Sequence, residues 1–170
     1  DADIVAREIV EKGQPALAQI QSAFGDWVLL ESGELNRKAL REHIFQHPSA
    51  RQQLEDITHP AIRQSIIVQL EQANSPYVIL VSPLLFETNQ HLLTQRTLLI
   101  DASIELQIQR ASQRDGQSVE QIENIIQAQM PRDRKLDLAD YIAVNDGHLE
   151  HLYTQLHKLH LHYLELSLSI

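Results

Sequence analysis

Three short apolar runs constrain the fold of this 170-residue chain more than any other feature. They cover residues 77–81, 97–100 and 141–144, and they are apolar at nearly every position rather than at alternate ones. Continuous apolarity over four or five residues is typical of a strand that is buried on both faces. Helical periodicity separates the second run from the third, at residues 103–114 and 118–130. Strands that alternate with helices predict an α/β fold with a parallel sheet.

The rest of the chain is predicted to be mostly helical. Apolar residues recur at helical spacing over residues 16–24, 35–45 and 50–74, and residues 27–30 form a short extended piece. Pro60 either starts a second helix within the last of these segments or kinks the first. Residues 148–166 form the closing helix, whose leucines face the sheet.

Composition excludes several classes of function. The formal net charge of −9 argues against binding to a nucleic-acid backbone, so a phosphate partner must be met by local arginines. The sequence has no cysteine and therefore no disulfide or thiolate metal site. No apolar run is long enough to cross a bilayer, so we expect no membrane partner and a cytoplasmic location.

Asp1 and Asp3 are the first candidate site residues. Residues two apart on an extended segment point the same way, so both carboxylates could address one hydroxyl or one metal-bound water. The alternative is a solvated chain end in which Asp3 caps a helix, because Ile4-Val5-Ala6-Arg7 follows it.

Glu87 is a candidate because it closes Pro83-Leu-Leu-Phe-Glu87, directly after the predicted strand at residues 77–81. Ligands gather at the carboxyl ends of strands in open parallel sheets, and a carboxylate there can hold a metal or a substrate group. A capping glutamate after a hydrophobic strand is the other interpretation.

Basic residues flank the helix predicted after Gly116. Arg110 and Arg114 are four residues apart and share one helix face. The second group consists of Arg132, Arg134 and Lys135. Converging guanidinium groups suit phosphoryl oxygens, and a segment between two such groups is typical of a mobile lid. A solvated face, with Asp115 and Asp133 as partners, is the alternative.

Asn145-Asp146-Gly147 follows the last predicted strand, where a backbone turn could receive a flat base. A routine turn with Asp146 as a helix cap would give the same pattern. The histidines of the closing helix favour a solvated face over a metal site, since no carboxylate or cysteine is placed to complete a ligand shell.

Taken in order, these segments resemble the dephospho-CoA kinase family over nearly the whole chain. The residues that carry the resemblance are Asp1-Ala-Asp-Ile-Val-Ala-Arg7, Phe24-Gly25, Gly33-Glu-Leu-Asn-Arg-Lys-Ala-Leu40, Ile57-Thr-His-Pro60, Pro83-Leu-Leu-Phe-Glu87, Gln109-Arg110, Arg114-Asp-Gly116, Gln129-Met130, Ala139-Asp140 and Asn145-Asp-Gly147.

The resemblance implies a three-layer P-loop kinase-like fold with a parallel sheet. Its core would be residues 1–14, 76–114 and 132–170, with a helical subdomain for the CoA substrate at 15–75 and a lid at 115–131. It also implies transfer of the γ-phosphoryl group of ATP, accompanied by Mg²⁺, to the ribose 3'-hydroxyl of dephospho-CoA, the last step of CoA synthesis. We expect a monomer or a weak homo-oligomer.

Site residues carry over from the family by position. Asp3 would orient or deprotonate the acceptor hydroxyl and hold the metal, with Asp1 in support. Charge on the phosphoryl group would be stabilised by Arg114, Arg110 and Arg132. The acceptor would contact His59, Glu87 and Arg37, and the adenine would contact Asn145, Asp146 and Gly147.

Two departures from the family pattern matter. The family places a Gly-rich phosphate-binding loop and its strand before the Asp-Ala-Asp signature, and these 170 residues contain no such loop. We therefore expect this chain to lack the family's phosphate cradle and to be inactive by itself. Ser82 stands where many relatives carry an acidic residue, which weakens metal binding from that segment.

Two other functions remain open. One is a non-catalytic nucleotide-binding, CoA-binding or interaction module that keeps the acceptor pocket. The other is a kinase for another nucleoside or nucleotide, which the Asp-Ala-Asp and His-Pro signatures disfavour.

Overall fold

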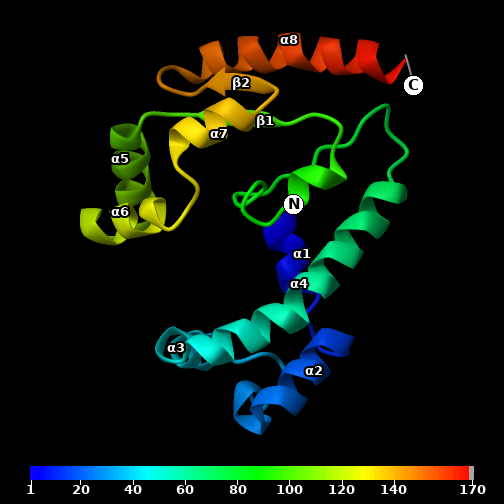
Figure 1. The fold of residues 1–170 in the computed structure, drawn as a ribbon, viewed down its shortest axis with the longest axis vertical. Coiled ribbons are helices and arrows are strands. Elements are labelled where there is room, and N and C mark those ends of the chain that lie inside the picture. Colours follow the sequence, from blue (N-terminus) through cyan, green and yellow to red (C-terminus); the bar gives the residue numbers. More distant parts are fainter. Residues whose placement is uncertain (169–170) are drawn as a thin grey trace. The chain divides into compact units, whose positions relative to one another are not determined.

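The structure is a computed structural model that describes residues 1–168, and it divides into two compact units. One unit contains residues 1–74 and 80–82, and the other contains residues 75–79 and the chain from Pro83 onward. Figure 1 labels the helices and strands of both units. The division of the chain into core, helical subdomain and lid stays a prediction, and residues 169 and 170 of its last segment lie outside the described residues.

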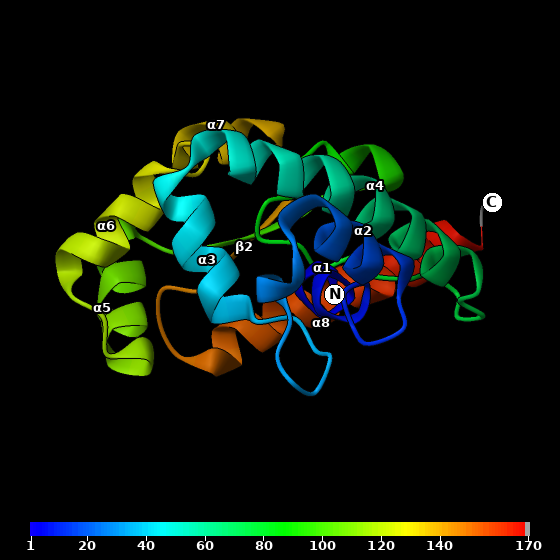
Figure 2. The same cartoon turned by 90° about the horizontal axis from the view of Figure 1, so that it is seen from below.

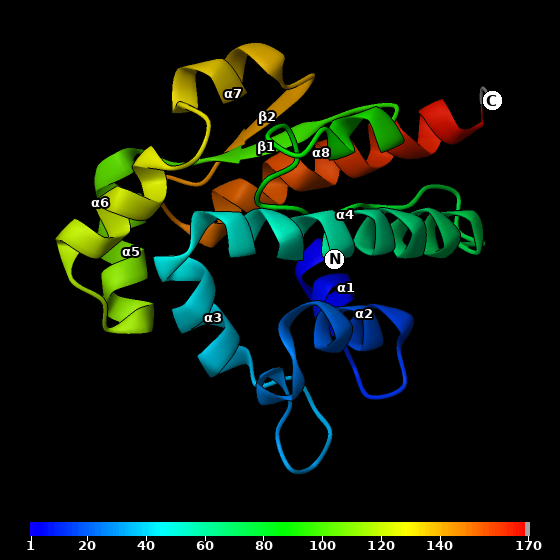
Figure 3. The same ribbon diagram turned by 60° about the horizontal axis from the view of Figure 1, so that its bottom comes forward.

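The first unit is helical. It contains α1 (Ala2–Glu8), α2 (Pro15–Phe24), the short 3₁₀ helix η1 (Asp26–Val28), α3 (Arg37–Gln46) and α4 (Pro48–Glu71). Helix α4 contacts α1, α2 and α3, and Figure 3 shows these three helices on the same side of it. Burial of the apolar faces between these helices is the main force that holds them together. The core side chains include Val5, Ile20, Val28, Leu40 and Ile66.

Pro60 lies inside α4, so the prediction that it starts a second helix is wrong. An interior proline removes one backbone hydrogen bond and costs a helix about 3 kcal/mol. Contacts with three other helices along its length compensate for that cost, and α4 runs without a break from Pro48 to Glu71.

The extended piece predicted at residues 27–30 begins later than expected. Residues 26–28 form η1, and Leu29 then forms an antiparallel bridge with Leu35 across the turn at Ser32-Gly33. Gly33 has a φ of 81°, a conformation that side chains with a Cβ rarely adopt, which explains why glycine occupies this turn.

The second unit contains the parallel sheet. Strand β1 (Leu98–Asp101) pairs with β2 (Tyr141–Val144), with Leu98 opposite Tyr141. Two of the three predicted strands are therefore confirmed, but their predicted burial on both faces is wrong, since Ile100 and Ile142 are 46% and 44% exposed. The connection between them consists of α5 (Ile104–Asp115), α6 (Val119–Gln127) and α7 (Arg132–Leu138). Helices α5 and α6 pack against each other, as Figure 2 shows, and α8 (Leu149–Ser167) packs against β2.

The predicted strand at residues 77–81 does not form, and the expected burial on both faces was wrong. Val78, Ile79 and Val81 are 49%, 64% and 52% exposed. A strand needs a neighbour to complete its ladder of backbone hydrogen bonds, and the described residues place no strand beside this run. Within the first unit, the Ala2 N–H donates to the Val81 carbonyl over 2.8 Å, an isolated bond rather than a ladder.

A side-chain lock closes the amino-terminal end of the sheet. The backbone N–H and the hydroxyl of Thr97 both donate to one carboxylate oxygen of Asp140, each over 2.8 Å. The N–H of Asp140 donates back to the Thr97 hydroxyl over 3.0 Å. The hydrogen bonds from Thr97 lower the pKa of Asp140. This lock sets the register, because each residue directly precedes its strand.

Replacement of Thr97 by valine should test the lock. Valine keeps the shape of threonine but removes the hydroxyl, so we expect Thr97→Val to lower the free energy of unfolding by about 1 kcal/mol. Urea denaturation at neutral pH measures this change. Thr154→Val is the control, because the Thr154 hydroxyl bonds only within its own helix, to the Glu150 carbonyl.

The same lock should make stability depend on pH. A carboxyl group with a lowered folded pKa contributes stability above its unfolded pKa of about 4, and this contribution is lost as the pH falls through the folded value. We expect the free energy of unfolding to fall less between about pH 6 and about pH 3 in Thr97→Val than in the unsubstituted chain. Urea denaturation at each pH measures this fall. Equal losses would contradict this assignment.

Candidate active site

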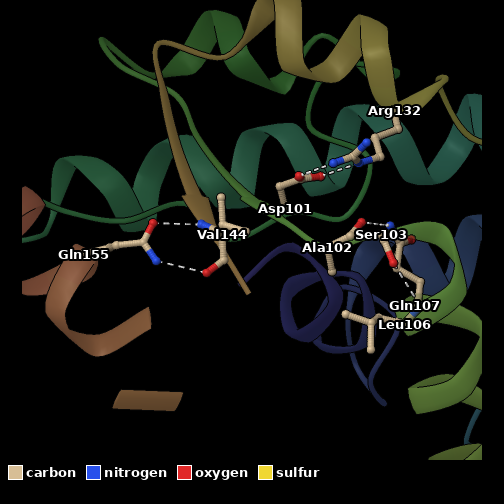
Figure 4. A network of polar contacts seen from close by, with 8 residues as sticks. All are labelled: Asp101, Ala102, Ser103, Leu106, Gln107, Arg132, Val144 and Gln155. Carbon is tan, nitrogen blue, oxygen red and sulfur yellow. Dashed lines mark hydrogen bonds and ion pairs between the residues drawn. The ribbon is translucent and has the colours of Figure 1, made fainter. Parts of the chain in front are cut away.

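A bidentate ion pair lies at the carboxyl end of β1. Both carboxylate oxygens of Asp101 accept hydrogen bonds from the Arg132 guanidinium, with Nε–Oδ1 at 2.7 Å and Nη2–Oδ2 at 2.5 Å (Figure 4). The Asp101 side chain is only 8% exposed, whereas that of Arg132 is 43% exposed. The hydrogen bonds and the charge of Asp101 raise the pKa of Arg132, so its guanidinium stays charged. The pair joins the last residue of β1 to the first residue of α7.

Two of the predicted site residues meet directly after β2. Arg110, on α5, donates from Nη1 to the backbone carbonyl of Asn145 over 2.7 Å. The N–H of Asn145 donates to the Asp101 carbonyl, also over 2.7 Å. The predicted phosphate-binding arginine and the predicted base-binding turn are therefore neighbours at the carboxyl end of the sheet.

Gln155 of α8 fixes the strand that leads into this turn. Its side-chain amide accepts from the Val144 N–H and donates to the Val144 carbonyl, each over 3.0 Å (Figure 4). The backbone groups of Val144, which do not face β1, are satisfied in this way by a side chain, as a neighbouring strand would satisfy them.

The connection from β1 to α5 is also held by side chains. The Ser103 hydroxyl caps α5 by accepting from the Leu106 N–H over 3.3 Å, and the Gln107 amide donates to the Ala102 carbonyl over 2.8 Å (Figure 4). Backbone and Ser103 hydrogen bonds lower the pKa of Glu105 in the first turn. These contacts fix the start of the helix that carries Arg110 and Arg114.

Arg114 shares no hydrogen-bond partner with Arg110 or Arg132 within the described residues of this unit. It forms a two-bond pair with Asp115, with both distances 2.7 Å, and its side chain is 77% exposed. Hydrogen bonding to Arg114 lowers the pKa of Asp115. The sequence allowed two interpretations of Arg114, a contact with phosphate and a pair with Asp115. The structure shows the pair, but exposed ion pairs of this kind are weak and readily exchange partners.

Glu87 is held in place rather than capping a helix. Its Oε1 accepts from the Met130 N–H over 2.8 Å and lies 3.3 Å from the Lys135 ammonium nitrogen. Its Oε2 is buried and has no hydrogen-bond partner among the described residues. Burial raises the pKa of Glu87, but the bonds from Met130 and its own N–H, together with Lys135, outweigh this effect and leave the pKa lowered.

Asp1 and Asp3 do not lie on an extended segment, so that expectation was wrong. Asp1 is the cap of α1, and its Oδ1 accepts from the N–H groups of Asp3 and Ile4 at 2.8 and 3.4 Å. Asp3 is in the first turn of the helix, where a carboxylate favours the positive end of the helix dipole. The cap predicted by the alternative interpretation therefore exists, but Asp1 provides it instead of Asp3.

The remaining predicted residues lie on the surfaces of their units. In the first unit, Arg37 is exposed and donates to the Arg7 carbonyl over 3.3 Å, and His59 is exposed on α4. In the second unit, Asp146 and Gly147 form the exposed turn before α8, whose cap position is His148 without a side-chain cap bond. The interpretation of Asp146 as the cap of this helix is therefore wrong.

The histidines of α8 are not all solvated. His160 bonds the Tyr77 hydroxyl at 2.6 Å, and His162 bonds the Tyr141 hydroxyl at 2.9 Å. In residues 1–168, no three histidine, cysteine or acidic side chains cluster so that they could hold a metal ion. None of the helices described is long and apolar enough to span a membrane.

Comparison with known proteins identifies the family. The sequence model of the dephospho-CoA kinase family matches residues 1–151. The chain belongs to the dephospho-CoA kinase family. It is 70% identical over 164 residues to a dephospho-CoA kinase of Acinetobacter baylyi, covering 96% of this chain and 84% of that one. It is 45% identical to the dephospho-CoA kinase of Idiomarina loihiensis, covering 99% and 84%.

Solved structures confirm the fold. A crystal structure from Thermus thermophilus superposes with a TM-score of 0.78 at 30% identity, covering 95% of this chain and 81% of that one. The dephospho-CoA kinase of Campylobacter jejuni gives a TM-score of 0.70 at 28% identity, covering 96% and 83%. The predicted family and fold class are thus confirmed. As a member of a kinase family, the protein uses ATP as its phosphoryl donor.

Two residues of this candidate site in the kinase were not predicted from the sequence. Asp101 carried a usable signal, because it is a charged residue that directly follows an apolar run of strand length. Gln155 carried none, since a glutamine on a helical surface is common and its bond to Val144 depends on where α8 packs.

Replacement of Glu87 by glutamine should test its role in this kinase. The amide can still accept from Met130 but no longer neutralises Lys135, whose side chain is only 16% exposed. We expect Glu87→Gln to lower the free energy of unfolding by about 1–3 kcal/mol, measured by urea denaturation. Glu123→Gln, at an exposed position of α6, is the control.

A double variant shows whether the stability lost in Glu87→Gln comes from the ion pair or from changed packing. In Glu87→Gln the Lys135 ammonium group keeps its hydrogen bond to Gln129 but loses its counter-charge. Adding Lys135→Met removes this unneutralised charge, so we expect Glu87→Gln/Lys135→Met to recover part of the lost stability. If the double variant is less stable than Glu87→Gln, the ion pair does not explain the effect.

Proposed function

We propose that this protein transfers the γ-phosphoryl group of ATP to the ribose 3'-hydroxyl of dephospho-CoA and so completes CoA synthesis. The observation that carries the proposal is the meeting of Arg110, Arg132 and Asn145 at the carboxyl ends of the two paired strands. This is where ligands bind in parallel α/β sheets, and phosphoryl transfer depends on positioned positive charge.

The arginines of the second unit supply that charge. Arg132 and Arg110 are oriented by Asp101 and by the Asn145 carbonyl, so little ordering is needed before they meet a phosphate. Arg114 exchanges Asp115 for a phosphoryl oxygen, which its exposed pair permits. The turn at Asn145–Gly147 receives the adenine.

The acceptor hydroxyl is activated by Asp3. The cap formed by Asp1 orders the first turn of α1 and therefore the backbone that carries Asp3. We assign contacts with the acceptor to His59 and Arg37, which are exposed on the same unit, and to Glu87 of the second unit.

Magnesium accompanies the nucleotide. Mg²⁺ is usually held by one or two carboxylates, with the remaining positions filled by phosphates and water. The oxygen ligand offered by the Asp3 carboxylate suits this ion. When bound, the ion would neutralise charge on the phosphates. Asp3 would be its protein ligand.

Activity measurements on three proteins test the proposal. The first is the chain of 170 residues, and the second is a loop-bearing form, in which the family's Gly-rich strand–loop–helix unit precedes Asp1. The third is the loop-bearing form with Asp3→Asn. We expect CoA from ATP, Mg²⁺ and dephospho-CoA only with the loop-bearing form, and we expect Asp3→Asn to lower kcat by about 100-fold or more.

A matched control removes one negative charge from the same unit. Glu11 is exposed in the turn after α1, so Glu11→Gln in the loop-bearing form should leave kcat within about twofold of the unsubstituted value. If the folded loop-bearing form makes no CoA, the protein is instead a binding module. An Asp3→Asn variant with unchanged kcat would remove Asp3 from the mechanism.

A further inference from the structure

Asp101 is the most buried carboxylate of the candidate site, and the family resemblance assigned it no role. We propose that Asp101 is a positioning residue for phosphoryl transfer, whose carboxylate holds the Arg132 guanidinium at the carboxyl end of β1. The link to phosphoryl transfer rests on the function proposed for Arg132.

The contacts of its two oxygens favour a positioning role for Asp101 over other roles. Both oxygens bond to Arg132, and the residue is 6% exposed. A carboxylate that is buried and has both oxygens engaged by one guanidinium group is poorly placed to take a proton from a substrate or to bind a metal ion. Its burial is costly unless the charge is paired, and the bidentate guanidinium provides that pairing.

Arg132 keeps donors for a second partner. A guanidinium has five N–H donors, and the pair with Asp101 uses the Nε and Nη2 groups. The Arg132 side chain is 43% exposed, so a phosphate in solution can reach it without separating the pair. Asp101 therefore fixes the orientation of the guanidinium and leaves part of it accessible.

The segment that carries Arg132 is anchored a second time. Glu87 accepts from the Met130 N–H and contacts the Lys135 ammonium group, on either side of Arg132 in the sequence. Two carboxylates from segments distant in sequence thus hold residues 130–135. This anchored segment overlaps the last two residues of the predicted lid at residues 115–131, so Arg132 lies where that predicted lid joins the anchored part of the unit. Of the two carboxylates, only Asp101 is hydrogen-bonded to Arg132 itself.

The first test measures position without requiring activity. Amide hydrogen exchange of residues 130–135 is compared in the chain of 170 residues, in Asp101→Asn and in Asp137→Asn. Asparagine places an N–H group opposite the guanidinium, so one of the two hydrogen bonds to Arg132 is lost. We therefore expect residues 130–135 to open more often in Asp101→Asn, which raises their amide exchange rate by about tenfold. Asp137→Asn is the matched control, because Asp137 lies on α7, the helix that begins at Arg132. Its carboxylate is exposed and forms only a long ion pair of 3.8 Å with the exposed Arg134.

The second test measures function in the loop-bearing form. We expect Asp101→Asn to lower kcat by about tenfold or more and to change the KM for dephospho-CoA by less than about twofold. In an Arg132→Ala background, the same substitution should change kcat by less than about twofold, because Asp101 acts through Arg132. Asp101→Glu, which keeps the charge, should recover part of the lost kcat.

The outcomes are distinguishable. An unchanged exchange rate at residues 130–135 in Asp101→Asn overturns the inference, as does an equal loss of kcat with and without Arg132. If the unsubstituted loop-bearing form makes no CoA, the proposed function fails. The exchange experiment alone then decides whether Asp101 positions Arg132.

Discussion

The parallel pairing of β1 with β2 is the constraint on which the second unit depends. Thr97 and Asp140 join the two strands where they begin, and the Asn145 N–H joins them to the Asp101 carbonyl where they end. A shift of one residue in this register would turn every side chain to the opposite face of the sheet. It would also separate Asp101 from Arg132 and Asn145 from Arg110, so the register of four residues determines which polar groups meet.

Apolar runs in the sequence predicted strands correctly where the folded chain provides a neighbouring strand. The runs at residues 97–100 and 141–144 are strands because they pair with each other and α8 covers β2. The run at residues 77–81 has the same composition and is not a strand in the described chain, because pairing requires a neighbour that composition does not reveal. The family resemblance depended on ordered motifs over most of the chain and did not suffer from this ambiguity.

Site residues were predicted less completely, for reasons of geometry. One of the two interpretations of Asp1 and Asp3 places them on an extended segment, but the Asp1 side chain caps the backbone of α1 and so starts a helix at Ala2. Asp101 was missed because its importance depends on Arg132, which lies 31 residues away in the sequence. Arg110 and Asn145 were both named, yet only the folded chain shows that they are hydrogen-bonded to each other.

The amide of Gln155 has a consequence for assembly of the protein. An open strand edge invites pairing with another chain, which is a route to aggregation. At Val144 both backbone groups are already occupied by this glutamine, and β1 covers the other edge of β2. A strand from a second molecule would have to displace the amide before it could extend the sheet there. The side chain that steadies the proposed nucleotide turn therefore also hinders pairing with a second molecule at Val144.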